Sequence, residues 1–180
     1  SLCLVCFVAI IYVINANNIP TLFPLILPVG AIVGFLMYNL GILGDRTVFL
    51  GDNGSVALGF LCAWVLVYFS NIENAVISPV TALWLVAIPF VDAVGVIFSR
   101  ILNKLKVLNS HRDHIHHKLI NRGLSHEIVF SVLIVVSGFL AYIGLFFNKN
   151  YPDESFYSFY AFLVFWVCYY LISRRISLDV

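Results

Sequence analysis

Two clusters of polar residues stand out in a chain that is otherwise almost entirely apolar. The first is Gly51-Asp52-Asn53-Gly54-Ser55, and the second is His111-Arg112-Asp113-His114-Ile115-His116-His117. A carboxylate oxygen is a hard ligand that suits Mg²⁺, which binds through few carboxylates together with substrate phosphates. Imidazole and guanidinium groups can hold a diphosphate or transfer protons. The two clusters together are suited to chemistry on a phosphorylated substrate.

The first cluster places Asp52 between two glycines, just before an apolar stretch that predicts a helix. Glycine allows a tight turn and the close approach of a ligand, and a helix start presents unpaired N–H groups. We therefore predict that Asp52 is a metal ligand and that Asn53 binds substrate. Asn39, which precedes the same loop, is a further candidate for substrate binding. The alternative is a simple helix cap and turn with a solvated Asp52.

The second cluster belongs to a segment, residues 99–127, that contains all five histidines of the chain. In a helix, His114 and His117 would share one face and Arg112 and His116 another, because residues three or four apart are neighbours. A transition-metal site is an alternative, although zinc is the weaker choice because no thiolate lies on that side. A solvated basic loop attracted to anionic lipid is another.

Asp92 is the only charged residue between positions 74 and 99. A carboxylate within an apolar helix is costly unless it faces a polar cavity or a partner. It could orient a histidine or a lysine near the site, and we count it among the catalytic candidates. The alternative is a carboxyl group that packs by hydrogen bonding to a neighbouring helix.

The composition decides which kind of fold must position these residues. The chain has 180 residues, of which 62% are hydrophobic and 11% charged, whereas soluble domains are about 45–50% apolar and about 25% charged. This excludes a soluble enzyme domain, a disordered chain and a disulfide scaffold. It predicts an all-α, polytopic membrane helix bundle, because a span needs about 20 apolar residues. The expected six spans are residues 2–14, 20–40, 54–70, 78–98, 128–147 and 156–173.

Charge distribution predicts the orientation of this bundle. If the spans alternate, nine of the ten basic residues lie on one side, in loop 41–53, loop 99–127 and the C-terminal tail. Cytoplasmic loops carry such an excess of lysine and arginine, so both polar clusters should face the cytoplasm. We expect one membrane domain over residues 1–180 with a His-rich cytoplasmic loop at 99–127. Within that loop, residues 99–108 predict an amphipathic interfacial helix, Gly123 a helix break, and Ser125 with Glu127 the start of the next span.

Four segments then occur in the order of a known family. They are Val48-Phe49-Leu50-Gly51-Asp52-Asn53-Gly54-Ser55, Ser78-Pro79-Val80-Thr81-Ala82-Leu83-Trp84, Ile88-Pro89-Phe90-Val91-Asp92 and His111-Arg112-Asp113-His114-Ile115-His116-His117. On these motifs the chain resembles the polyprenyl-phosphate N-acetylhexosamine-1-phosphate transferases, also called glycosyltransferase family 4. Within them it looks most like the bacterial enzymes that transfer N-acetylglucosamine-1-phosphate. The resemblance runs over nearly the whole chain.

The resemblance implies a reaction and roles for residues. UDP-N-acetylglucosamine and undecaprenyl phosphate would give undecaprenyl-diphospho-N-acetylglucosamine and UMP, with Mg²⁺ or Mn²⁺, at the cytoplasmic face of the bacterial inner membrane. The product would start O-antigen or enterobacterial common antigen synthesis. The implied partners are these two substrates and the lipid bilayer, without nucleic acid; a homodimer is left open. Site residues carried over by motif are the metal ligand Asp52, the catalytic residues His114, His116, His117 and Asp92, and the substrate-binding residues His111, Arg112, Asn39 and Asn53.

The chain also departs from the family pattern. Two acidic motifs, an Asp-Asp pair and an Asn-rich segment ending in Asp-Gly, are not found, and the chain begins at Ser1 rather than Met. We therefore expect the C-terminal portion of a longer transferase that is inactive by itself. Asn53 replaces a residue that is usually small, which is a mild departure.

Three alternatives to this function remain. A phospho-N-acetylmuramoyl-pentapeptide transferase fits less well, because its three histidines usually form an unbroken run and here Ile115 interrupts them. A metal or anion transporter would favour polar residues at mid-membrane depth on several spans, whereas here they gather at one face. A purely structural remnant is the third alternative.

Overall fold

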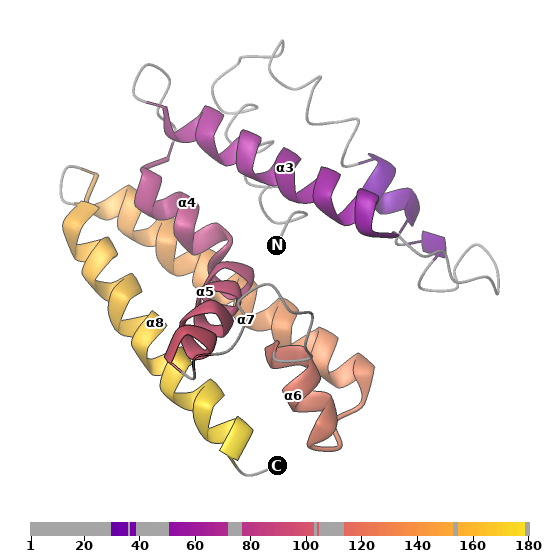
Figure 1. The fold of residues 1–180 in the computed structure, drawn as a ribbon. Helices are drawn as coiled ribbons and strands as arrows, with labels where there is room; N and C mark the ends of the chain where they lie inside the picture. The colour runs from indigo at the N-terminus through magenta and orange to yellow at the C-terminus, as the bar shows by residue number, and fades with distance from the viewer. Residues whose placement is uncertain are drawn as a thin grey trace. The chain divides into compact units, whose positions relative to one another are not determined.

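A computed structural model describes residues 30–35, 37–38, 51–71, 77–102, 104, 114–152 and 155–178, and in this part every regular element is a helix (Figure 1). The prediction of an all-α chain is therefore confirmed for the described residues. The chain forms two compact units, residues 2–79 and residues 80–180, which are described separately. The helices are α3 (Gly51–Ser70), α4 (Pro79–Leu85), α5 (Ala87–Leu102), α6 (Ile115–Asn121), α7 (His126–Asn150) and α8 (Ser155–Leu178).

Three of these helices are long and apolar enough to cross a membrane: residues 53–70, 126–150 and 155–176. They confirm the expected spans 54–70, 128–147 and 156–173. Their large apolar side chains are mostly exposed: Val135 on α7 is 70% exposed and Tyr160 on α8 is 63% exposed. Apolar faces of this extent require a membrane or a partner to cover them.

The expected count of six spans is not confirmed. Among the described residues there are three spanning helices, or four if α4 and α5 count as one broken span. Of the two expected N-terminal spans, only residues 30–35 and 37–38 lie within the described part, and they are helical.

The expected span over 78–98 is not one continuous helix, because α4 and α5 meet at a bend of 86°. The physical reason lies in Pro89. Proline has no N–H to donate to the carbonyl four residues earlier, and its ring clashes with that carbonyl, here the one of Leu85. The helical ladder therefore stops at Leu85 and starts again at Ala87, and Phe90 N donates to Val86 O at 3.0 Å.

The interfacial helix expected at 99–108 lies only partly within the described residues. Residues 99–102 are the last turn of α5, and Lys104 lies in a turn with a φ of 54°. Residues 105–108 lie outside the described part.

The expected break at Gly123 is confirmed, with a φ of 89°. Ser125 then caps α7 by accepting a hydrogen bond from Ile128 N at 3.3 Å.

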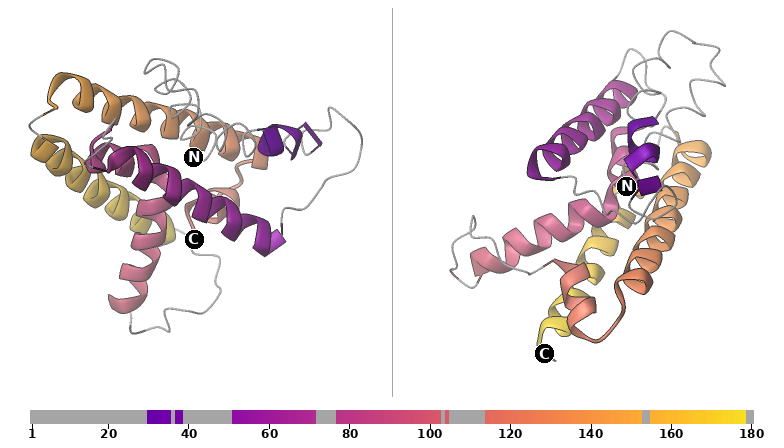
Figure 2. Two further views of the ribbon diagram at one scale, coloured as in Figure 1. Left: turned by 90° about the horizontal axis from the view of Figure 1, so that it is seen from above. Right: turned by 90° about the vertical axis from the view of Figure 1, so that its right-hand side faces the viewer.

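In the second unit, α7 and α8 run side by side as a pair, and α5 and α6 each pack against both of them (Figures 1 and 2). The buried core comprises Trp84, Ala87, Val91, Leu140 and Phe162. The ring of Trp84 meets Phe162 edge to face at 5.1 Å. Its Nε1 donates to Ser158 Oγ at 3.0 Å. These contacts hold the bend between α4 and α5 against the α7–α8 pair.

Gly144 on α7 permits a close approach of Trp84, which yields a first prediction. A β-carbon on Gly144 would lie 2.4 Å from the β-carbon of Trp84. In a helix, Gly→Ala normally stabilises by about 0.5–1 kcal/mol. Here we expect Gly144→Ala to destabilise by about 1–3 kcal/mol, because overpacking forces the backbone to move.

Thermal unfolding in nanodiscs checks this prediction. Gly138→Ala on the same helix is the matched control, since a β-carbon there meets nothing within 4 Å. The control should be neutral or slightly stabilising. A Gly144→Ala variant as stable as the control would contradict the close contact.

Candidate functional site

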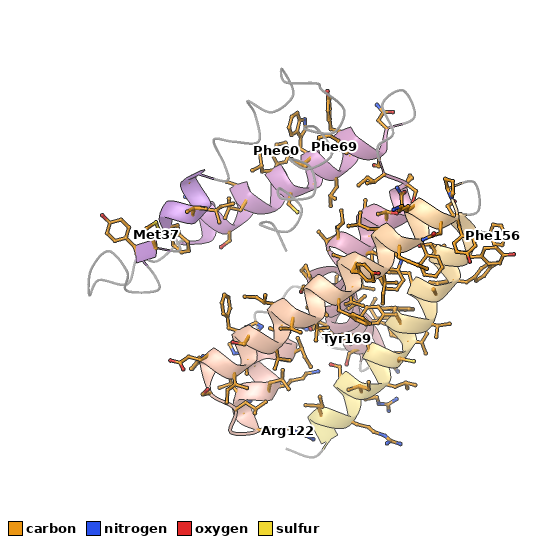
Figure 3. The ribbon with its side chains drawn as sticks, turned by 180° about the vertical axis from the view of Figure 1, so that it is seen from behind. Met37, Phe60, Phe69, Arg122, Phe156 and Tyr169 are labelled. Atoms are coloured by element: carbon orange, nitrogen blue, oxygen red, sulfur yellow. The ribbon has the colours of Figure 1, made fainter. Side chains whose placement is uncertain are left out.

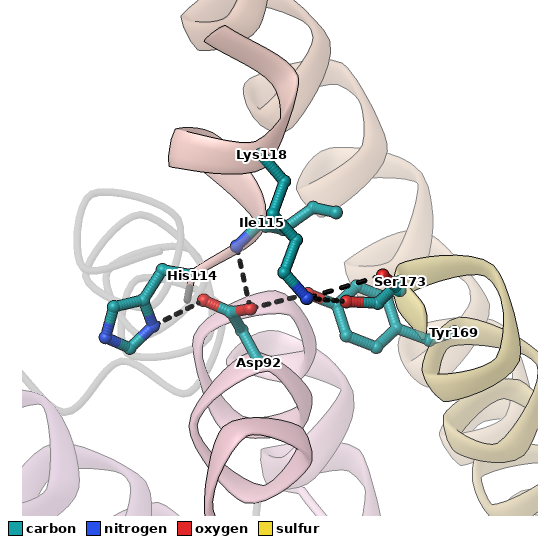
Figure 4. A network of polar contacts seen from close by, with 6 residues as sticks. All are labelled: Asp92, His114, Ile115, Lys118, Tyr169 and Ser173. Carbon is teal, nitrogen blue, oxygen red and sulfur yellow. Dashed lines mark hydrogen bonds and ion pairs between the residues drawn. The ribbon is translucent and has the colours of Figure 1, made fainter. Parts of the chain in front are cut away.

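Asp92 is the centre of a hydrogen-bond network that joins three helices of the second unit (Figure 4). Its Oδ2 lies 2.8 Å from His114 Nδ1. Its Oδ1 accepts hydrogen bonds from the backbone N–H of Ile115 at 3.0 Å and from the hydroxyl of Tyr169 at 2.8 Å. Asp92 is buried near the start of α5. Asp92 therefore links α5 to α6 and to α8.

The sequence allowed two interpretations of Asp92: it orients a histidine, or it packs by hydrogen bonding to a neighbouring helix. The structure contains both contacts, one to His114 and one to Tyr169 on α8. Ile115 N is one of the unpaired donors of a helix start. Asp92 accepts its hydrogen bond, so α6 is capped from α5, and His114 at the cap position uses no side-chain cap of its own.

This arrangement fixes the protonation pattern of the His114 ring. An ionised carboxylate can only accept hydrogen bonds, so Nδ1 carries the proton and Nε2 keeps its lone pair when the ring is neutral. The side chain of His114 is 44% exposed, whereas that of Asp92 is 12% exposed. Nδ1 of His114 is therefore held by the buried Asp92, and Nε2 is the nitrogen left for contact with a substrate.

His116 and His117 lie on α6 beside this pair. The ring centroids of His116 and His117 are 4.1 Å apart, and those of His114 and His116 are 5.9 Å apart. The shared helix face considered for His114 and His117 requires one helix that includes both residues. Helix α6 begins only at Ile115, and His114 precedes it in an extended conformation. Three imidazoles nevertheless gather around the N-terminus of α6.

Burial lowers the pKa of the His116 imidazole from its ordinary value of 6.5. The nearby His117 and His114 rings lower it further, while Asp92 opposes the shift. His116 is therefore neutral at neutral pH. Because the unfolded chain binds this proton more readily, the shift makes stability fall as pH drops below 6.5 toward the folded-state pKa.

An NMR titration of histidine-labelled protein tests this second prediction. We expect the His116 resonance, assigned from its loss in His116→Gln, to titrate with a midpoint below 6.5. The loss of thermal stability between neutral and mildly acidic pH should be smaller in His116→Gln than in the parent. A midpoint at or above 6.5 would contradict the burial of this ring.

The other predicted site residues do not belong to the described part of the second unit. Asp52 and Asn53 are in the first turn of α3, in the first unit, where Gly51 has a φ of 67° and Asn53 is exposed. The remaining three, Asn39, His111 and Arg112, lie outside the described residues. The structure thus brings together Asp92, His114, His116 and His117.

Tyr169 and Ser173 on α8 join this site without having been predicted from the sequence. Lys118 on α6 donates from its Nζ to Ser173 Oγ at 2.9 Å and to Ser173 O at 3.3 Å. A tyrosine and a serine one helical turn apart in an apolar segment are a weak signal. The chain has nine tyrosines, and nothing in the sequence selects the one that reaches Asp92.

The donor chemistry decides which residue suits a divalent metal ion. Within the described ranges, no group of three or more histidine, cysteine, aspartate or glutamate side chains is arranged to hold a metal ion. Three of the about four acceptor sites of the Asp92 carboxylate are used by contacts within the protein, which leaves little of it for a metal ion. A carboxylate such as Asp52, together with substrate phosphates, matches what Mg²⁺ prefers.

Comparison with known proteins shows which family and which relatives the chain is similar to. Residues 1–70 match the family model "Glycosyl transferase family 4". Particular relatives agree with it: the undecaprenyl-phosphate alpha-N-acetylglucosaminyl 1-phosphate transferase of Escherichia coli K12 is 38% identical over 118 residues, which is 65% of this chain and 32% of the relative. The enzyme of the same name from Haemophilus influenzae is 36% identical over 126 residues, 69% of this chain and 36% of the relative.

These matches confirm the resemblance indicated by the sequence motifs. The chain spans about a third of the length of these relatives. No solved structure matches the chain. The apolar helices and the bacterial relatives together indicate a bacterial membrane protein.

Proposed function

We propose that this chain is part of a membrane transferase that moves N-acetylglucosamine-1-phosphate from UDP-N-acetylglucosamine to undecaprenyl phosphate and releases UMP. The observation that carries the proposal is the Asp92–His114 pair, with its 2.8 Å contact, beside two further imidazoles at one end of an apolar helix unit. The names of the relatives favour this reaction over that of a pentapeptide transferase.

In the proposed reaction an oxygen of undecaprenyl phosphate attacks the phosphorus that carries the sugar. The bond from this phosphorus to the oxygen of UMP breaks, and UMP leaves with the electron pair. Phosphoryl transfer of this kind depends mainly on positioning and on stabilisation of charge. Positively charged or hydrogen-bonding groups near the phosphates are therefore the main requirement of the site.

His114 meets this requirement through its outer nitrogen. With Nδ1–H held by Asp92, Nε2 is the nitrogen of His114 that can accept and donate a proton. Protonated His114 can then donate to a phosphate oxygen of the leaving UMP. The rings of His116 and His117, whose centroids are 4.1 Å apart, supply further donors for phosphate or nucleotide.

For residues outside this cluster we propose the roles that the sequence motifs predict. Asp52 would hold Mg²⁺, with Mn²⁺ as the alternative, and the ion would neutralise negative charge on the diphosphate. The substrate-binding residues that we propose are Asn39, Asn53, His111 and Arg112.

The ends of the helices in the second unit support the orientation that we propose. α6 lies at the end where α7 begins and α8 ends, and the nearby basic residues are Lys118, Arg122, Arg174 and Arg175. Lys149 lies at the other end of α7. This asymmetry supports a cytoplasmic position for the site, in the inner membrane of a bacterium.

UMP release by the full-length protein in nanodiscs tests the proposal. We expect UMP to form from UDP-N-acetylglucosamine only when undecaprenyl phosphate and a divalent cation are both present, and chelation to stop it. UMP formation that is independent of the lipid, or no UMP under any of these conditions, would contradict the proposed reaction.

A further inference from the structure

Two polar side chains on one face of α8 contact residues of the candidate site. Tyr169 and Ser173 are four residues apart, so they lie on the same side of the helix. The hydroxyl of Tyr169 donates to Asp92 Oδ1 at 2.8 Å, and Ser173 accepts from Lys118 on α6 at 2.9 Å. Tyr169 is labelled in Figure 3, and Figure 4 shows both contacts. Helix α8 thus contacts both the acid and the short helix that follows His114.

We propose that Tyr169 is a positioning residue that acts through Asp92 to orient the imidazole of His114. The inference rests on the proposed function, because it assigns to Tyr169 a part in the same transfer step. Tyr169 itself bonds to Asp92 and need not touch a substrate. Its effect is on the direction in which the Asp92 carboxylate presents Oδ2 to His114.

The geometry of the carboxylate supports this role. One oxygen of Asp92 faces His114, and the other is shared by Ile115 N–H and the Tyr169 hydroxyl. Without the tyrosine hydroxyl, Oδ1 would keep a single backbone donor at 3.0 Å. The orientation of the carboxylate plane would then be less restricted, and the hydrogen bond from His114 Nδ1–H to Asp92 Oδ2 would be weaker.

The Tyr169 ring is itself held in place. Its neighbour on α8 is Phe165, with ring centroids 6.3 Å apart. On the α5 side, a β-carbon built at Gly95 would lie 4.0 Å from the Tyr169 ring, so the ring packs against this glycine. A hydroxyl on a ring fixed in this way is a pre-organised donor to Asp92.

Tyr170 offers a matched control on the same helix. Its ring also lies near Gly95, 3.9 Å from a β-carbon built there, and it meets Phe98 edge to face at 5.3 Å. Tyr169→Phe and Tyr170→Phe therefore remove the same hydroxyl from adjacent, similarly packed rings. Only the first variant removes a hydrogen bond to Asp92.

The experiment compares these two variants in the full-length protein in nanodiscs. For Tyr169→Phe we expect kcat to fall about tenfold, with KM for UDP-N-acetylglucosamine changed by less than about twofold. Nitrogen NMR of histidine-labelled protein should show a reduced Nδ1–H signal for His114, assigned from its loss in His114→Gln. Tyr170→Phe should leave kcat and the signal unchanged.

A double-mutant cycle keeps the inference falsifiable. If Tyr169 acts through Asp92, Tyr169→Phe should have no further effect on kcat in an Asp92→Asn background. An unchanged Nδ1–H signal in Tyr169→Phe, equal effects of the two tyrosine variants, or additive effects in the cycle would overturn it. The NMR signal does not require transferase activity, so the inference and the proposed function can fail separately.

Discussion

Asp92→Asn is expected to lower kcat by about 100-fold to 10,000-fold, the range found when a general acid–base group loses its orienting partner. The carboxamide retains one oxygen and gains an NH₂ group, which must face one of the three donors. The backbone N–H of Ile115 and the hydroxyl of Tyr169 both point at Oδ1, so the NH₂ group should take the place of Oδ2. It would then donate to Nδ1 of His114 and force the proton onto Nε2, which is the wrong tautomer for the proposed role.

The same substitution should destabilise the fold by about 2 kcal/mol, because hydrogen bonds to a charged acceptor are replaced by weaker ones. His114→Gln is the companion variant. It should lose a similar share of activity but less stability, because Asp92 keeps its bonds to Ile115 and Tyr169. Steady-state kinetics and thermal unfolding measure both effects. An Asp92→Asn variant within a few-fold of parental kcat would contradict the role assigned to the pair.

Asp52→Asn is expected to reduce metal-dependent UMP release by about 100-fold or more, because an amide oxygen lacks the charge that holds Mg²⁺ beside a diphosphate. Asp52 is the second residue of α3. A first-turn acid also stabilises its helix through the dipole, by about 0.3–1 kcal/mol. The experiment must therefore separate metal binding from helix stability.

Glu127→Gln supplies that separation. Glu127 is the second residue of α7 and is exposed, so it makes the same carboxylate-to-amide change at an equivalent helix position. We expect Glu127→Gln to retain activity, and Mn²⁺ binding followed by electron paramagnetic resonance to weaken only in Asp52→Asn. Unchanged metal-dependent UMP release by Asp52→Asn would contradict the assignment of Asp52 as a metal ligand.

The spanning helices were predictable because their signal is local. A charge-free apolar run of about 20 residues is typical of a membrane-spanning helix. Residues 54–70, 128–147 and 156–173 accordingly appear as helices at nearly the expected positions. The bend between α4 and α5 was only partly predictable. Pro89 indicates a kink, but the 86° angle also depends on how Trp84 packs against Phe162 and Gly144, which the sequence does not reveal.

The candidate site, like the fold, was predictable only in part. A lone aspartate in an apolar segment predicts a polar partner, and His114 was among the candidates for it. The position of His114 before α6, rather than on it, could not be predicted, because it results from Asp92 capping this helix from α5. Tyr169 was missed because a contact between residues 77 positions apart leaves no local pattern.

The central claim is that sugar and phosphate move together onto the lipid. The most direct test supplies UDP-N-acetylglucosamine with radioactive phosphorus in the phosphate next to the sugar, together with undecaprenyl phosphate and the full-length protein in nanodiscs. The account predicts that the label appears in the lipid fraction and that the released UMP is unlabelled. Label retained in water-soluble UDP, with the sugar alone on the lipid, would contradict it.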